Sequence, residues 1–151
     1  MKRYFNISGP CNPDSHYILP SETRCKGIIE LIDQKQYFVI HAARQSGKTT
    51  LLMELSKKLN DSGRYIALYC SLESLQEITD PKEGIPAVVK AIKTEAKMNQ
   101  GTKGYVFGKD ADYDDFTNVL RMSLVEFCIE VKKPLVFFFD EVDCLSNGTL
   151  I

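Results

Sequence analysis

Three short apolar runs, separated by stretches with helical periodicity, constrain the fold of this chain more than any other feature of its sequence. The runs cover residues 37–42, 65–70 and 135–139, and they contain no acidic residue and no proline. Strands of this composition are typical of a parallel sheet covered on both faces, because neither side of such a strand meets water. Strands alternating with helices therefore predict an α/β fold built around a parallel sheet.

The stretches between these runs place apolar residues at spacings of three and four, as on one face of a helix. Helices are expected at about 22–33, 48–60, 85–98 and 112–130. Ser21 is expected to be the N-cap of the first helix. Residues 1–21 are rich in glycine, proline and asparagine, which favours an extended amino-terminal segment with turns. The remainder, residues 22–151, is long enough for one core domain.

The first apolar run leads directly into the motif Ala42-Ala43-Arg44-Gln45-Ser46-Gly47-Lys48-Thr49. It follows the P-loop pattern G-x-x-x-x-G-K-[ST], with alanine as the small residue at the first position. A loop between a strand and a helix start can hold a triphosphate, because its backbone N–H groups and the helix dipole attract negative charge. The predicted phosphate-binding residues are Ala43, Arg44, Gln45, Ser46, Gly47, Lys48, Thr49 and Thr50.

Three residues of the motif have separate predicted roles. Gly47 permits close approach of the backbone, Lys48 places its ammonium against the β- and γ-phosphates, and Thr49 offers its hydroxyl to Mg²⁺. The alternative is an incidental Gly-Lys-Thr at a helix start. The apolar run before the motif and the helical pattern after it favour the phosphate-binding interpretation.

An acidic pair, Asp140-Glu141, follows the third apolar run. A carboxylate at the carboxyl end of a strand can hold the water shell of Mg²⁺ beside a P-loop, so Asp140 is the predicted metal residue. Glu141 can orient or deprotonate an attacking water and is, with Lys48, the predicted catalytic residue. Asp143 is expected to be an N-cap or a surface acid.

Two blocks, Tyr4 to Pro20 and Gln36 to Thr50, together with Asp140-Glu141, resemble a group of bacterial AAA-type ATPases close to the STAND and origin-recognition branches. The resemblance implies a P-loop three-layer sandwich of the additional-strand, catalytic-glutamate division. Nucleotide kinases and GTPase-like proteins usually lack a glutamate directly after the magnesium-site aspartate. In the group resembled, the segment before the first helix often packs on adenine, so Tyr17, Ile18 and Leu19 are candidates for base contact. Packing of these three under the helix is the equal alternative.

The same resemblance implies parts that this sequence does not contain. In that division a further strand with a polar sensor residue inserts between the P-loop strand and the strand of Asp140, and an arginine finger and a helical lid follow. The sequence ends at Ile151, so an incomplete core, cut off after the acidic motif, is expected.

The expected function is binding of ATP and Mg²⁺, with ATP hydrolysis as part of an AAA-type switch or motor. One alternative is a P-loop kinase that transfers phosphate to a small acceptor, although the five arginines of the chain are not clustered. Another is a truncated nucleotide-binding fragment without turnover. Self-association or effector domains are expected only in a longer protein.

Charge and composition limit the other partners. The formal net charge is -1, which provides no global positive field for nucleic acid. A helix face carries Lys90, Lys93 and Lys97, which favours a solvated surface over a nucleic-acid contact. No apolar run approaches the roughly 20 residues of a membrane span, and the first residues lack a signal-peptide core, so a cytoplasmic location is expected.

The five cysteines are scattered and form no C-x-x-C pair, which favours reduced and mostly buried thiols. Cys11 and His16 are close in sequence, but without a second pair they do not predict a metal site.

Overall fold

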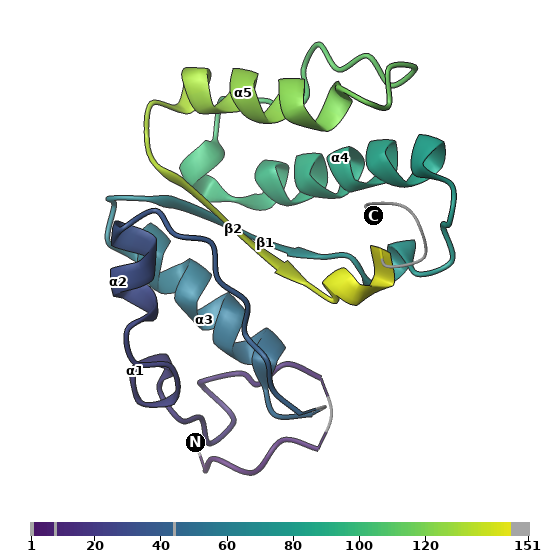
Figure 1. Cartoon of the computed structure of the whole chain (residues 1–151). Helices are drawn as coiled ribbons and strands as arrows, with labels where there is room; N and C mark the ends of the chain where they lie inside the picture. Colours follow the sequence, from purple (N-terminus) through teal and green to yellow (C-terminus); the bar gives the residue numbers. More distant parts are fainter. Residues whose placement is uncertain (1, 8, 44, 146–151) are drawn as a thin grey trace. The chain divides into compact units, whose positions relative to one another are not determined.

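The computed structural model describes residues 2–7, 9–43 and 45–145 of this mixed α/β chain (Figure 1). It divides into two compact units, Met1–Leu55 and Ser56–Ile151. Helix α3, Lys48–Asp61, begins in the first unit and ends in the second. No helix among the described residues has the length and apolar character needed to span a bilayer.

In the first unit, the helix expected over 22–33 is divided into α1, Ser21–Arg24, and α2, Ile28–Asp33. The break begins at Cys25, whose φ of -137° is not helical, and ends at Gly27, whose φ of 85° lies in the left-handed region. The N-cap of α1 is Pro20, so the predicted N-cap, Ser21, is instead its first helical residue.

The strand predicted over 37–42 was wrong: no residue of this segment is in a strand. Tyr37 is fully exposed and Val39 is 77% exposed, whereas Phe38 and Ile40 are half-buried. A strand exists only through ladder hydrogen bonds with a neighbour, and among the described residues β1 and β2 pair only with each other. Apolar composition alone therefore did not produce a strand.

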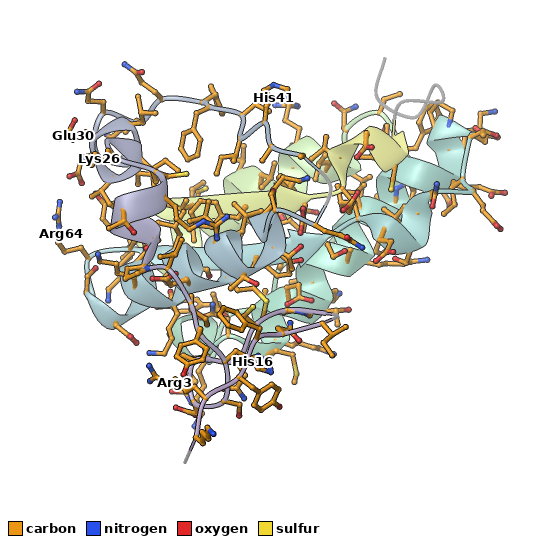
Figure 2. All side chains as sticks on the ribbon, turned by 90° about the horizontal axis from the view of Figure 1, so that it is seen from below. Arg3, His16, Lys26, Glu30, His41 and Arg64 are labelled. Carbon is orange, nitrogen blue, oxygen red and sulfur yellow. The ribbon has the colours of Figure 1, made fainter. Side chains whose placement is uncertain are left out.

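The amino-terminal segment has the turns and short extended pieces that its composition predicts. A single parallel bridge joins Tyr4 to His16, and their rings meet edge to face at 4.8 Å. The Nδ1 atom of His16 accepts from the Asn12 N–H at 2.8 Å, and the Cys11 sulfur accepts from Asn6 at 3.7 Å. Cys11 and His16 therefore take part in local hydrogen bonds of this turn. Figure 2 shows His16 together with Arg3 on this segment.

In the second unit, β1, Ile66–Ser71, and β2, Leu135–Asp140, form a parallel pair as predicted. The register runs from Ile66 beside Leu135 to Ser71 beside Asp140, so both carboxyl ends lie at the same edge. The parallel arrangement is confirmed, while the described sheet contains only these two strands.

Helices α4, Pro81–Met98, and α5, Val119–Val131, pack on one another, and α4 also packs on β1 (Figure 1). Short 3-10 helices complete the unit: η1, Glu73–Leu75, η2, Gln100–Thr102, and η3, Val142–Leu145. Four side chains on the inward face of α4 are at most 3% exposed: Val88, Val89, Ile92 and Ala96. They join Ile66, Leu68 and Cys70 of β1 in one core.

Two helix starts differ from the sequence expectation. Helix α4 begins at Pro81 rather than near residue 85, because the Asp80 carboxylate accepts from the Lys82 N–H and caps the first turn. Helix α5 begins at Val119 rather than at 112, because the preceding aspartates close turns instead. Asp112 accepts from the Asp114 N–H at 3.0 Å.

The loop between α4 and α5 is anchored in the core by Phe107, which is 1% exposed and meets Phe127 edge to face at 5.3 Å. Two of the lysines on α4 also hold this loop. Lys93 donates to the Gly108 carbonyl at 3.0 Å, and Lys90 lies 5.4 Å from the centre of the Tyr113 ring. The lysine face is thus partly engaged within the protein: Lys93 is half-buried, whereas Lys90 and Lys97 are exposed.

All five cysteines are free. Cys70 and Cys144 are buried, Cys11 and Cys25 are half-buried, and Cys128 is exposed. Burial, with the Glu95 charge nearby, raises the pKa of the Cys70 thiol to about 12, so this cysteine is a small apolar core residue at neutral pH.

The outer edge of β1 is closed by side chains. The Asn60 amide bonds the Ala67 backbone twice: its oxygen accepts from the N–H at 2.9 Å and its nitrogen donates to the carbonyl at 2.8 Å. Ser56 and Asn99 donate to the same carbonyl at 3.0 and 2.8 Å. Asn60 therefore takes the place that a neighbouring strand would have at this point of the ladder.

We expect Asn60→Ala to lower the free energy of unfolding by about 1–3 kcal/mol, because the buried Ala67 N–H loses its acceptor. Urea denaturation followed by circular dichroism measures the change. Gln76→Ala, at an exposed residue of the same unit, is the control and should leave the midpoint unchanged. Equal midpoints for the two variants would show that Asn60 does not stabilise the sheet edge.

Candidate functional site

The P-loop segment lies directly before the amino terminus of α3, whose first residue is Lys48. Two of its residues adopt left-handed backbone conformations, with φ of 60° at Gln45 and 80° at Gly47. The second requires glycine, both for its φ and because an added Cβ would lie 3.3 Å from the Arg24 guanidinium. The helix begins where the motif predicted it, and the loop ahead of it is sharply turned.

Arg24, the last residue of α1, holds this loop through two charge-assisted hydrogen bonds. Its Nη2 donates to the Ser46 carbonyl at 2.7 Å, and its Nη1 donates to the Gly47 carbonyl at 3.1 Å. In a trans peptide the carbonyl and the following N–H point in opposite directions. Fixing these two carbonyls on Arg24 therefore turns the Gly47 and Lys48 N–H groups away from it, which is the orientation that a phosphate cradle requires.

The Lys48 ammonium donates to the carbonyls of Ala42 and Ala43 at 3.1 and 3.4 Å. The side chain therefore folds back over its own loop and is half-buried there. An ammonium has three donors, so a bound anion can share it with these carbonyls.

The amino-terminal segment is attached to α3 beside the P-loop. Thr50 is buried, and its Oγ1 accepts from the Cys11 N–H at 3.1 Å. Glu54 accepts from the Ser21 N–H at 3.0 Å. Thr49, between the loop and this anchor, is half-buried. Thr50 is thus engaged with the protein's own backbone, a role that the motif did not predict.

The three candidates for adenine contact lie on the same segment. Tyr17 is 55% exposed and packs on Phe5 with ring centres 5.1 Å apart, Leu19 is 69% exposed, and Ile18 is half-buried. Base contact and packing under the helix both stay predictions for these three residues. Farther along, His41 is exposed ahead of the loop (Figure 2). Arg44 lies outside the described residues.

In the second unit, Asp140 ends β2 and is only 6% exposed. Its Oδ2 accepts from the Tyr69 hydroxyl at 3.1 Å, and its Oδ1 accepts from the Glu141 N–H at 3.1 Å. The carboxylate is thereby fixed in direction at the carboxyl edge of the sheet. The sequence does not predict the role of Tyr69, because its contact with Asp140 depends on the register between β1 and β2.

Glu141 leaves the strand with a φ of 56° and is exposed. Its carboxylate, that of Asp143 and the Cys144 sulfur lie within 4.8 Å of one another, the sole such trio able to share a metal ion in the described part of the chain. Burial, with the charges of Asp143 and Glu141, raises the pKa of the Cys144 thiol, so the carboxylates are the better ligands. Asp143 is the surface acid that was expected.

No protein-family model matches this sequence, and neither a curated protein nor a solved structure matches it. The resemblance to AAA-type ATPases therefore stays a prediction. The class that the structure does define is a mixed α/β chain with a two-stranded parallel sheet. Any function has to be argued from the P-loop segment and from the acidic end of β2.

We expect Arg24→Ala to increase amide hydrogen exchange at Leu51 by about tenfold or more, because its N–H donates to the Gly47 carbonyl that Arg24 no longer holds. Exchange measured by NMR tests this. Arg3→Ala removes the same charge from the exposed amino-terminal segment and is the matched control. Unchanged exchange in Arg24→Ala would mean that the loop keeps its shape without this guanidinium.

Proposed function

We propose that this chain binds MgATP through the loop before α3 and through Asp140, and that it hydrolyses the bound ATP. The observation that carries the proposal is the loop itself. A glycine with left-handed φ precedes a lysine at the first position of a helix, and Arg24 directs the backbone N–H groups of both. This combination suits a compact polyanion better than any neutral ligand.

Lys48 would contact the β- and γ-phosphates by sharing or exchanging its hydrogen bonds to Ala42 and Ala43. Thr49 and Asp140 have oxygen atoms of the kind that magnesium prefers, and they are the proposed metal residues. Bound Mg²⁺ would neutralise charge on the phosphates. Tyr69 is a positioning residue in this scheme, because its hydroxyl sets the direction of the Asp140 carboxylate.

In the proposed hydrolysis, a water oxygen bonds to the γ-phosphorus while the bond from that phosphorus to the β–γ bridging oxygen breaks. The proton leaves the water through Glu141 and passes to the released phosphate, which gives ADP and inorganic phosphate. Glu141 suits this role because its carboxylate is exposed directly after the magnesium-site aspartate. Lys48 would stabilise the charge that develops on the phosphoryl oxygens.

The proposal also includes the type of P-loop fold and the residues that contact adenine. The parallel pairing of β1 and β2 is compatible with a P-loop three-layer sandwich of the AAA type. Tyr17 and Leu19 are exposed and, with Ile18, are the proposed adenine contacts. The chain would then serve as a nucleotide-driven switch or motor.

Lys48→Ala should abolish measurable ATP binding, because the phosphates lose their principal cation. Calorimetric titration with ATP and Mg²⁺ measures the affinity. Lys57→Ala is the control, since Lys57 is an exposed lysine of the same helix that pairs with Asp61. An ATP affinity in Lys48→Ala equal to that of Lys57→Ala would remove the P-loop from the binding site.

Glu141→Gln should bind ATP as the wild type does but should release no phosphate above background, because the amide cannot accept the proton of water. Phosphate release at saturating MgATP measures turnover, and Asp143→Asn is the neighbouring control that should keep it. If wild type and Glu141→Gln release phosphate equally, Glu141 is not catalytic. If the wild type phosphorylates added acceptors instead, transfer rather than hydrolysis is the activity.

A further inference from the structure

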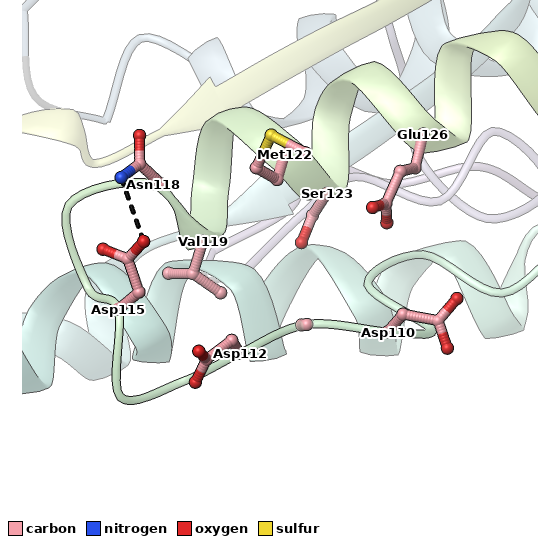
Figure 3. A pocket seen from close by; sticks show the side chains of 9 residues that line it. Asp110, Asp112, Asp115, Asn118, Val119, Met122, Ser123 and Glu126 are labelled. Atoms are coloured by element: carbon pink, nitrogen blue, oxygen red, sulfur yellow. Dashed lines mark hydrogen bonds between the residues drawn. The ribbon is translucent and has the colours of Figure 1, made fainter.

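A pocket that shares no lining residue with the proposed nucleotide site lies at the start of α5 in the second unit (Figure 3). Its volume is about 180 Å³, enough for several water molecules. Four of the side chains that line it are acidic: Asp110, Asp112, Asp115 and Glu126. None of its lining residues is basic, so an occupant with positive charge meets no repulsion from the walls.

Ser123 gives this pocket a buried polar group without a partner. The residue is 1% exposed, it lines the pocket, and its hydroxyl has no hydrogen-bond partner among the residues that the structure describes. In Figure 3 the hydroxyl points toward the loop that carries Asp110 and Asp112. Leaving a buried hydroxyl unsatisfied costs about 1–3 kcal/mol, so a ligand that bonds to it recovers free energy.

Gly108 keeps the space around this hydroxyl open. A Cβ at residue 108 would lie 3.2 Å from the Ser123 oxygen, and the φ of 58° also favours glycine. Lys93 is engaged with the Gly108 carbonyl. Glycine at residue 108 therefore leaves the Ser123 oxygen without a side chain packed against it from this loop position.

The carboxylates are spread around the pocket rather than gathered at one point. Asp112 accepts from the Asp114 N–H, and Asp115 accepts from Asn118 at 2.9 Å (Figure 3). Among the described residues, no three of the pocket's carboxylates converge closely enough to share an ion. A metal ion needs such convergence, whereas an extended organic cation can meet separate carboxylates at separate atoms.

The apolar part of the lining consists of Ala111, Val119 and Met122, and Asn118 adds a polar amide. A lining that combines apolar side chains with carboxylates suits an alkyl chain that ends in an ammonium group. Hydrogen bonds from Thr117 and Asn118 lower the pKa of the Asp115 carboxyl, which keeps it ionised in mild acid.

We propose that this pocket binds a primary ammonium on a short aliphatic chain, with Ser123 as the acceptor at its base and Glu126 and Asp112 as its charge partners. The alkyl chain lies against Val119 and Met122. The same chemistry occurs in free diamines and in the lysine side chain of a partner peptide, so the test uses both.

The test titrates the ATP-free full chain with 1,4-diaminobutane and, separately, with N-acetyl-lysine amide, and follows the methyl signal of Met122 by NMR. We expect a saturable shift at Met122, with Met53 and Met98 unaffected as internal references. Ser123→Ala and Glu126→Gln should each weaken binding by about fivefold or more. Glu77→Gln, at an exposed glutamate outside the pocket, is the charge-matched control and should bind as the wild type does.

Saturable binding of either amine supports the ammonium site. The amine with the higher affinity shows whether a free diamine or a lysine side chain fits the pocket better. The absence of a saturable shift with both amines overturns it, as does equal affinity in Glu126→Gln and Glu77→Gln. A higher affinity for Ca²⁺, added as CaCl₂, than for either amine would show that the pocket is a metal site and not an ammonium site. A Ser123→Ala variant that is more stable and binds equally well would show that the hydroxyl is only an unsatisfied core group.

Discussion

The parallel register between β1 and β2 is the constraint on which the second unit depends. Because Ser71 lies beside Asp140, both strands present their carboxyl ends at one edge, and alternate residues of the pair share a face. One face supplies Leu68 and Cys70 to the core with α4. On the other face the Tyr69 hydroxyl reaches the Asp140 carboxylate. A shift of one residue in this register would exchange the faces and separate that pair.

The first unit shapes its loop by different means. The segment ahead of the loop is not in a strand, so ladder hydrogen bonds do not position the loop. A guanidinium does so instead, because two donors of its planar fork reach two consecutive carbonyls. A lysine in place of Arg24 could not bond both in that fork. The phosphate-binding geometry that we propose thus depends on a side chain from a separate short helix.

Local patterns predicted most of the regular structure, and contacts between distant residues account for the rest. The buried faces of α3 and α4 follow from apolar spacing, whereas the start of α4 depends on the cap at Asp80. The strand expected over 37–42 did not form, because a strand also needs a neighbour that its own sequence cannot specify. The residues of the candidate site also fall into those that a local motif predicts and those that depend on contacts between distant residues. The loop residues and Asp140 were predicted from motifs, whereas Arg24 and Tyr69 act across 22 or more positions in sequence and carry no motif.

The side-chain hydrogen bonds to Ala67 affect where a further strand could add to the sheet. Three side chains saturate the hydrogen-bonding groups that Ala67 turns away from β2, so an incoming strand would have to displace all of them before it could add on that side. Within the described residues, the far side of β2 carries no paired strand. Intermolecular β-pairing between copies, the first step of many aggregation reactions, would therefore be opposed at Ala67 on this border of the sheet.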